Sequence, residues 1–223
     1  MDPKSGLDGE GGVDEEGAVD PKRLAEAERA DLVDLLATLT PAQWNAPSLC
    51  AGWRVREVVA HMFSWEELGP AGVVRRLVKG GLRQGRANAV GVADYSSSST
   101  GDLLELARGH LTPRGLTTGF GGRIALLDAL VHHQDIRRPL NLPREIPAER
   151  LICALRFARM APPVGGPKRM RGLTLTATDL AWSTGRGPAV HGPGEALLMA
   201  VAGRRDAVAE LSGPGLPTLD GRI

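Results

Sequence analysis

The stretch Arg123-Ile-Ala-Leu-Leu-Asp-Ala-Leu-Val-His-His-Gln-Asp-Ile-Arg137 decides the fold of this chain, because it predicts one amphipathic helix. Its apolar side chains recur at a period close to 3.6, at Ile124, Leu127, Leu130, Val131 and Ile136. Asp128, His132 and Asp135 follow at i, i+4 and i+7, so they share one face beside the apolar stripe. A carboxylate and an imidazole one turn apart can bind a single metal ion. Because buried polar groups need partners, we expect other polar side chains to meet this face.

The composition indicates a globular protein with no obvious electrostatic partner. The chain has 223 residues, 42% of them hydrophobic, which is enough for one large domain or two small ones. The formal net charge of +1 gives no reason to expect binding to nucleic acid or to an anionic membrane. Two cysteines give no disulfide framework, and we find neither an apolar leader nor a run of about 18 apolar residues. We therefore expect a cytoplasmic protein without a membrane span.

The periodicity predicts a helical bundle behind a short tail. Residues 1–20 are acidic and rich in glycine, and we interpret them as a disordered tail. Residues 21–161 are predicted to form the bundle, with further helical patterns over 21–39, 53–68, 102–111 and 148–160. A basic helical pattern over residues 72–86 is interrupted by Gly80-Gly81.

The period changes towards the end of the chain. Residues 161–167 are rich in proline and glycine and predict a linker. Residues 173–178 alternate apolar and polar side chains, as a half-buried strand does. A glycine-rich turn at residues 185–188 predicts a hairpin between its flanking segments. We therefore expect residues 168–223 to form a small α+β domain.

A second histidine borders an apolar helix face. His61 lies beside the predicted buried side chains Val58 and Met62 in the helix expected over residues 53–68. If His61 meets Asp128 and His132 in one bundle, three ligands and one open position make the pattern of a catalytic metal site. Asp135 could then fix the tautomer of the imidazole. The spacing alone is weak, and the same groups could instead form hydrogen bonds to neighbours or face water.

Two motifs carry a family resemblance. The stretch Leu49-Cys-Ala-Gly-Trp-Arg-Val-Arg-Glu-Val-Val-Ala-His61 resembles the first motif of the mycothiol-dependent maleylpyruvate isomerase family, within the DinB-like superfamily. The stretch Asp128-Ala-Leu-Val-His-His-Gln-Asp-Ile-Arg137 resembles the second. Two segments, Val190-His-Gly-Pro193 and Ala202-Gly-Arg204, resemble turns in the C-terminal domain of these proteins.

The resemblance implies a mainly α fold, in which a DinB-like four-helix bundle is followed by a small α+β C-terminal domain. It also implies a divalent metal ion held by His61, Asp128 and His132, with Asp135 in a supporting position. Zinc is the best chemical match for two imidazoles and a carboxylate. The family often has glutamate where this chain has Asp128, so the carboxylate is shorter here. Mycothiol is the implied thiol cosubstrate, and the implied partner is a small electrophilic substrate, bound by a monomer or homodimer.

Several functions fit this resemblance. A thiolate could add to an activated alkene and leave again, which makes an isomerase, or remain attached, which makes an S-transferase. The alternatives are a non-catalytic, metal-binding stress-response module and a zinc-dependent hydrolase. Cys50 is expected to be a buried structural cysteine, since the implied thiol is external, and His133 is expected to point away from His132.

Overall fold

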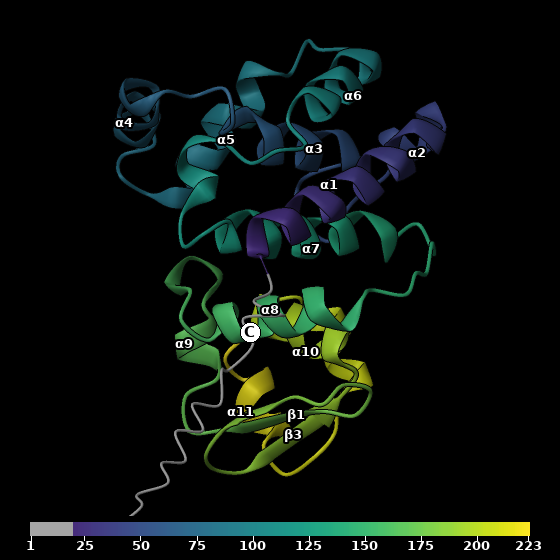
Figure 1. The fold of residues 1–223 in the computed structure, drawn as a ribbon, viewed down its shortest axis with the longest axis vertical. Helices are drawn as coiled ribbons and strands as arrows, with labels where there is room; N and C mark the ends of the chain where they lie inside the picture. The colour runs from purple at the N-terminus through teal and green to yellow at the C-terminus, as the bar shows by residue number, and fades with distance from the viewer. Residues whose placement is uncertain (1–19) are drawn as a thin grey trace, which may run out of the picture.

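The computed structural model describes residues 20–223 (Figure 1). The tail predicted over residues 1–20 lies outside this range, apart from Asp20. Helix α1 spans Pro21–Thr38 and begins where predicted. The Asp20 carboxylate accepts a hydrogen bond of 2.9 Å from the Lys22 amide, and Pro21 occupies the first turn, where a missing N–H costs nothing. A single helical turn, α2 (Pro41–Trp44), follows it.

Four helices form the bundle that the sequence predicts. They are α1, α3 (Val55–Ser64), α6 (Thr100–Gly109) and α7 (Arg123–Arg137), and α7 packs against both α1 and α3. Their apolar faces share one buried core, which includes Leu36, Val58, Leu103 and Ile136. The bounds of α7 are those expected from its apolar period. This confirms the four-helix bundle.

Two further helices lie outside the bundle. Helix α4 (Pro70–Lys79) and helix α5 (Gln84–Asp94) pack against each other, and α5 also contacts α3. The chain turns back at Gly80, where a Cβ atom would lie 2.5 Å from the Ala87 amide nitrogen. Only glycine allows this approach, so the basic pattern over residues 72–86 is split between two helices.

The remainder of the chain combines helices with a small sheet. Helix α8 spans Ala148–Ala158, and the three strands are β1 (Thr174–Ala177), β2 (Ser183–Gly185) and β3 (Ala189–Gly192). The chain ends with α10 (Gly194–Val201), the 3-10 turn η3 (Arg205–Glu210) and α11 (Leu216–Asp220). The 3-10 turn η2 (Pro162–Val164) and helix α9 (Gly166–Arg169) begin within the segment predicted as a linker, residues 161–167.

The hairpin predicted around residues 185–188 is wrong. The strand order is β2-β1-β3, with β1 antiparallel to β2 and parallel to β3, so the turn joins two strands that do not pair. Instead it crosses the start of β1, where a Cβ atom on Gly185 would lie 2.1 Å from the Leu173 carbonyl oxygen. Its glycines therefore serve a close crossing of two backbones rather than a two-residue turn.

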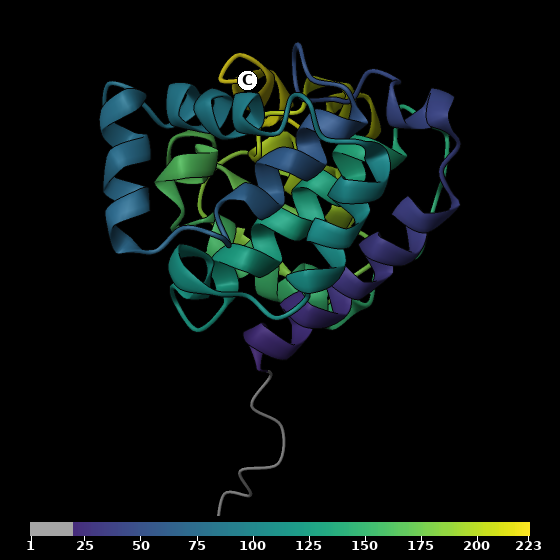
Figure 2. The same ribbon diagram turned by 90° about the horizontal axis from the view of Figure 1, so that it is seen from above.

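A second core joins the helices to the sheet. It runs from Leu126 and Leu130 on α7 through Leu155 on α8 to Leu175 on β1 and Leu198 on α10. In Figure 1, α8 and α10 lie between the bundle and the sheet, and in Figure 2 the bundle helices cover this layer. The domain boundary at residues 161–168 stays a prediction. None of the helices between residues 20 and 223 has the length and apolar character needed to cross a bilayer.

Candidate metal site

The two histidine motifs meet where α7 crosses α3. The rings of His61 and His132 are perpendicular, with centroids 4.9 Å apart. One ligand atom each from His61, Asp128 and His132 lies within 4.8 Å of the others, and His132 Nε2 is 3.5 Å from Asp128 Oδ1. The structure thus brings together all three residues that the sequence proposes as ligands. Their role as ligands stays a prediction.

His61 is buried and held as a neutral imidazole. Its ring packs on the Trp53 indole with the centroids 5.1 Å apart. Burial, helped by the nearby His132, lowers the pKa of His61 to about 4. Its Nδ1 atom is buried without a hydrogen-bond partner among the described residues. A neutral imidazole is the form that binds metals, and a buried ring nitrogen without a partner is costly.

His132 is oriented by a fully buried carboxylate. Asp135 Oδ2 lies 2.8 Å from His132 Nδ1, one helical turn further along α7. Burial disfavours the charged forms of both groups, but their mutual interaction lowers the pKa of Asp135 and, together with Asp128, raises that of His132. The contact directs Nε2 of His132 towards Asp128 and His61. Asp135 is therefore placed where a supporting residue of a metal-binding histidine is usually found.

The sequence did not identify the partner of Asp135. Arg204 lies between α10 and η3, and its guanidinium binds both carboxylate oxygens, with 2.8 Å between Nε and Oδ1. The pKa of Arg204 is raised because this ion pair outweighs the cost of burial. Arg204 is 69 residues from Asp135, so helical spacing contains no sign of the contact. The resemblance of residues 202–204 to a family turn was the one available signal.

Cys50 lies beside the candidate site and also packs against the bundle core. It is half-buried, with its Sγ atom 3.1 Å from Asp135 Oδ2 and 3.6 Å from His132 Nδ1. These three residues form a second group with metal-binding geometry, on the opposite ring nitrogen of His132. The adjacent loop is fixed because the Leu49 amide donates a hydrogen bond of 3.0 Å to the Asp135 carbonyl oxygen. We expected a buried structural cysteine, and the structure shows a thiol that donates to Asp135.

Asp128 is the accessible member of the group. Its side chain is 30% exposed, whereas the side chain of Asp135 is fully buried. Burial opposes its charge, but His132, His61 and the buried Arg29 of α1 together lower the pKa of Asp128. Asp128 is therefore the member of the group that solvent reaches most easily.

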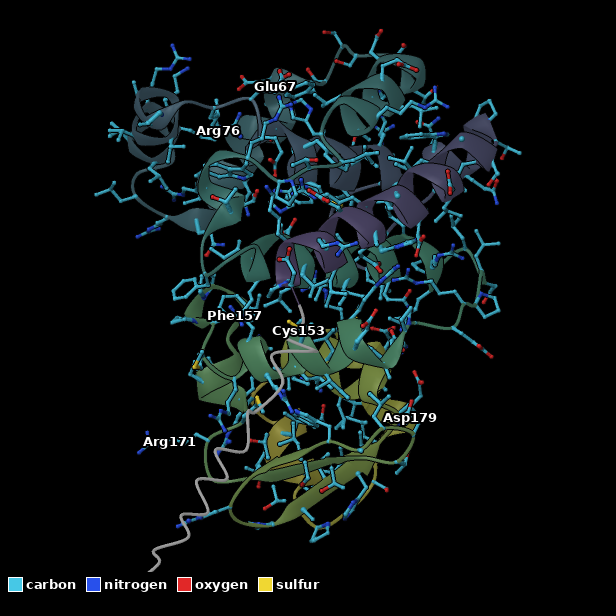
Figure 3. The ribbon with its side chains drawn as sticks, in the orientation of Figure 1. Glu67, Arg76, Cys153, Phe157, Arg171 and Asp179 are labelled. Carbon is cyan, nitrogen blue, oxygen red and sulfur yellow. The ribbon has the colours of Figure 1, made fainter. Side chains whose placement is uncertain are left out.

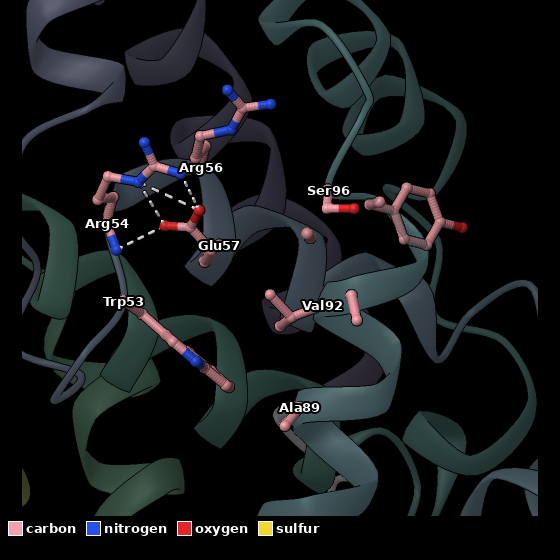
Figure 4. Close-up of a pocket in the computed structure, with 10 residues that line it drawn as sticks. Trp53, Arg54, Arg56, Glu57, Ala89, Val92 and Ser96 are labelled. Carbon is pink, nitrogen blue, oxygen red and sulfur yellow. Dashed lines mark hydrogen bonds and ion pairs between the residues drawn. The ribbon is translucent and has the colours of Figure 1, made fainter.

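A small cavity lies beside Trp53. Its volume is about 200 Å³, and it lies between α3 and α5 (Figure 4). Ala60, Ala89 and Val92 provide its apolar wall, while Arg54 and Glu57 form an ion pair at its rim. Trp53 lines this cavity and also packs on His61, so one indole contacts both the cavity and the histidine pair.

His133 points away from His132, as expected, and joins a separate buried network. Its Nδ1 donates a hydrogen bond of 2.8 Å to the Glu28 carboxylate of α1. Its Nε2 accepts a hydrogen bond of 2.8 Å from Arg137 Nε. Arg144 and Arg150 also bind Glu28. Burial opposes the charge of Glu28, but these partners lower its pKa to about 2. This network links α1, α7 and α8.

Comparison with known proteins gives two findings. Residues 25–109 match the family described as the mycothiol maleylpyruvate isomerase N-terminal domain. The fold resembles the crystal structure of the mycothiol-dependent maleylpyruvate isomerase and that of its histidine-to-alanine mutant, with TM-scores of 0.52 and 0.54 and 13% sequence identity to each. Each comparison covers 87% of this chain and 91% of the other. No curated protein has significant sequence similarity to this chain. The family model confirms the predicted resemblance over residues 25–109, and the structural neighbours confirm the predicted fold class.

Proposed function

We propose that this chain, whose residues 25–109 match the mycothiol maleylpyruvate isomerase N-terminal domain family, is a metal-dependent enzyme that uses mycothiol. His61, Asp128 and His132 hold the divalent cation, with zinc as the best chemical match. The observation that carries the proposal is the convergence of the two family motifs: His61 lies within the matched domain, and its two partners lie on α7, outside it.

The donor set is suitable for such a cation. Two imidazoles and one carboxylate leave a fourth tetrahedral position open, which is typical of catalytic sites. The buried, neutral His61 ring offers one nitrogen to such a cation beside Asp128 and His132. The cation would also neutralise the negative charge of Asp128, whose Oδ1 atom lies 3.5 Å from His132 Nε2. A bound cation of this kind stabilises the thiolate form of a thiol at its open position.

The surrounding residues would position the reaction. Asp135 and Arg204 fix the ring of His132, so the ligand geometry does not have to be created when the thiol binds. Trp53 packs on His61 and excludes water from that ring. Asp128 lies at the accessible edge, where the thiol and the substrate enter.

The reaction we propose is isomerisation of an alkene conjugated to a carbonyl. The thiolate sulfur adds to the alkene, and the electron pair of the double bond moves to the carbonyl oxygen as an enolate. Rotation about the new single bond and collapse of the enolate expel the thiolate, so atoms and electrons balance. Maleylpyruvate, named in the structural neighbours, is a substrate of this class.

Metal analysis of the purified protein tests the site. We expect about one equivalent of zinc in the wild type and a large loss in His61→Ala and His132→Ala, because each variant removes one of three ligands. His191→Ala, which alters a histidine on β3, is the matched control and should keep the metal. Equal metal content in all four proteins would refute the site.

Product analysis tests the reaction. With mycothiol and maleylpyruvate, we expect a geometric isomer and an unchanged amount of free thiol. A stable S-conjugate would instead identify an S-transferase, and turnover without thiol would identify a hydrolase. A metal-loaded protein with no turnover on a panel of electrophiles would favour the non-catalytic module.

A further inference from the structure

One flank of the molecule carries the exposed large apolar side chains of the described residues. They lie on α4, on the turn after it, in the loop before α7 and at the end of α8. The six side chains are those of Val74, Val78, Leu82, Leu116, Phe120 and Met160. Isolated exposed apolar residues are ordinary, but their gathering on neighbouring segments indicates an interaction surface.

The segments that carry these side chains are basic throughout. Residues 69–93 contain five arginines and lysines, residues 110–127 contain two and residues 151–178 contain five, and none of the three contains an aspartate or glutamate. The whole chain has 27 basic and 26 acidic residues, so its acidic groups lie elsewhere. Most of these basic side chains are exposed, Arg75, Lys79 and Arg83 among them, whereas Arg76 is buried.

Parts of these three segments share one side of the fold. In Figures 1 and 2, α4, the loop before α7 and α9 lie on the left of the molecule in both views. Figure 3 labels Arg76, Phe157 and Arg171 down this same side. Phe120 packs on Phe157 with the ring centroids 5.3 Å apart, which joins the loop before α7 to α8. We call the exposed surface of α4, the turn after it, the loop before α7 and the segment from the end of α8 through α9 the basic flank.

Two of its apolar side chains are presented by an unfavourable backbone. Leu82 and Phe120 have φ values of +57° and +55°, in the left-handed region that large residues rarely adopt. Their side chains are nevertheless 77% and 68% exposed, so little burial offsets the strain. Glycine would adopt these left-handed turns without the backbone strain. Leucine and phenylalanine at these positions are consistent with contact to another molecule.

We propose that the basic flank docks on the surface of an anionic lipid bilayer. Its arginines and lysines would meet the phosphates of the headgroups, while Val78, Leu82 and Phe120 would enter the boundary with the acyl chains. A second copy of this chain is a poor occupant, because two basic flanks would repel each other. The exposed apolar side chains stand on several separate segments, and the cavity described above lies between α3 and α5, behind α4 rather than among these side chains. This shape suits a deformable bilayer better than a complementary protein surface.

Co-sedimentation of the full chain with lipid vesicles tests the proposal. We expect binding to vesicles containing one third phosphatidylglycerol, weaker binding as salt rises, and little binding to phosphatidylcholine alone. Arg75→Glu/Lys79→Glu should bind at least about 25-fold more weakly, at about fivefold for each charge removed. The control Arg108→Glu/Arg186→Glu changes two exposed basic residues outside the basic flank and should bind like the wild type.

The variant Val78→Ser/Leu82→Gly separates docking from folding. Glycine relieves the left-handed backbone at residue 82, so this variant should unfold at no lower temperature than the wild type and yet lose vesicle binding. Absence of vesicle binding by the wild type at low salt would overturn the proposal, as would equal binding by all variants. An acidic polypeptide that binds the wild type and not Arg75→Glu/Lys79→Glu, without vesicle binding, would assign the basic flank to a protein partner instead.

Discussion

At the scale of single residues, His132 is the centre of the candidate site because each of its ring nitrogens has a different task. Nε2 faces Asp128 and His61, while Nδ1 faces Asp135 and Cys50. The helical spacing of α7 predicted the partners at i−4 and i+3. It could not predict Arg204 or Cys50, because both reach the site from segments far away in the sequence.

Asp135→Asn should weaken metal binding without removing a ligand. An amide cannot accept from His132 and hold Arg204 as the carboxylate does, so the imidazole loses its fixed orientation. We expect zinc affinity to fall about 10- to 100-fold, measured by competition with a chelating dye. Asp206→Asn alters a partly exposed carboxylate outside the site and should leave the affinity unchanged. An unaltered affinity in Asp135→Asn would show that the contact is not functional.

At the scale of elements, the position of α7 depends on a glycine that the apolar pattern does not reveal. Gly122 precedes α7 with φ of +90°, and a Cβ atom there would lie 2.7 Å from the Lys22 Cα atom. The start of α1 thus lies directly against the start of α7. The pattern predicts that α7 forms, but the contact between the two backbones is a tertiary property that no local pattern contains.

Gly122→Ala should therefore lower the stability of the fold by more than the strain of a left-handed backbone alone would. We expect a loss of about 1 kcal/mol in the free energy of unfolding from the left-handed conformation, and a further cost of similar or larger size from displacement of α1. Gly172→Ala is the matched control, since Gly172 also has a positive φ but no neighbouring atom within 4 Å of a Cβ position. Urea denaturation of both variants measures the difference, and equal losses would contradict the close packing.

At the scale of the whole molecule, the overall composition did not predict how charge is distributed over the surface. A net charge of +1 gave no reason to expect an anionic partner, but three segments carry basic residues without a single acidic one. The alternation that predicted a strand at residues 173–178 was sound, whereas the strand order depended on a backbone crossing at Gly185. The local periodicity of apolar residues predicts individual helices and strands well, but it contains no information on how distant segments pack together.

The buried Glu28 network should make the stability of the whole fold sensitive to acid. The pKa of Glu28 is lowered from 4.5 to about 2, so its contribution is complete above pH 4.5 and is lost as the pH falls towards 2. That contribution is about 3 kcal/mol from a shift of this size. Chemical denaturation across pH 2–7 measures it.

The matching variant is Glu28→Gln. It should be less stable than the wild type at pH 7 by about 3–5 kcal/mol, because it leaves Arg144 and Arg150 without their buried partner. It should also lose less stability than the wild type between pH 4.5 and pH 2. Glu105→Gln removes an exposed ion pair and should keep the wild-type profile. A steep acid transition that persists in Glu28→Gln would assign the pH dependence to other groups.

The continuous core through α7, α8 and α10 has a consequence for how the molecule opens. Because Leu126 and Leu130 of α7 pack in the same cluster as Leu175 and Leu198, loosening the sheet would expose one side of the helix that carries Asp128 and His132. The candidate site and the C-terminal sheet should therefore melt as a single cooperative unit. Amide hydrogens in α7 and α10 should then exchange with solvent through the same opening event, at the rate of global unfolding.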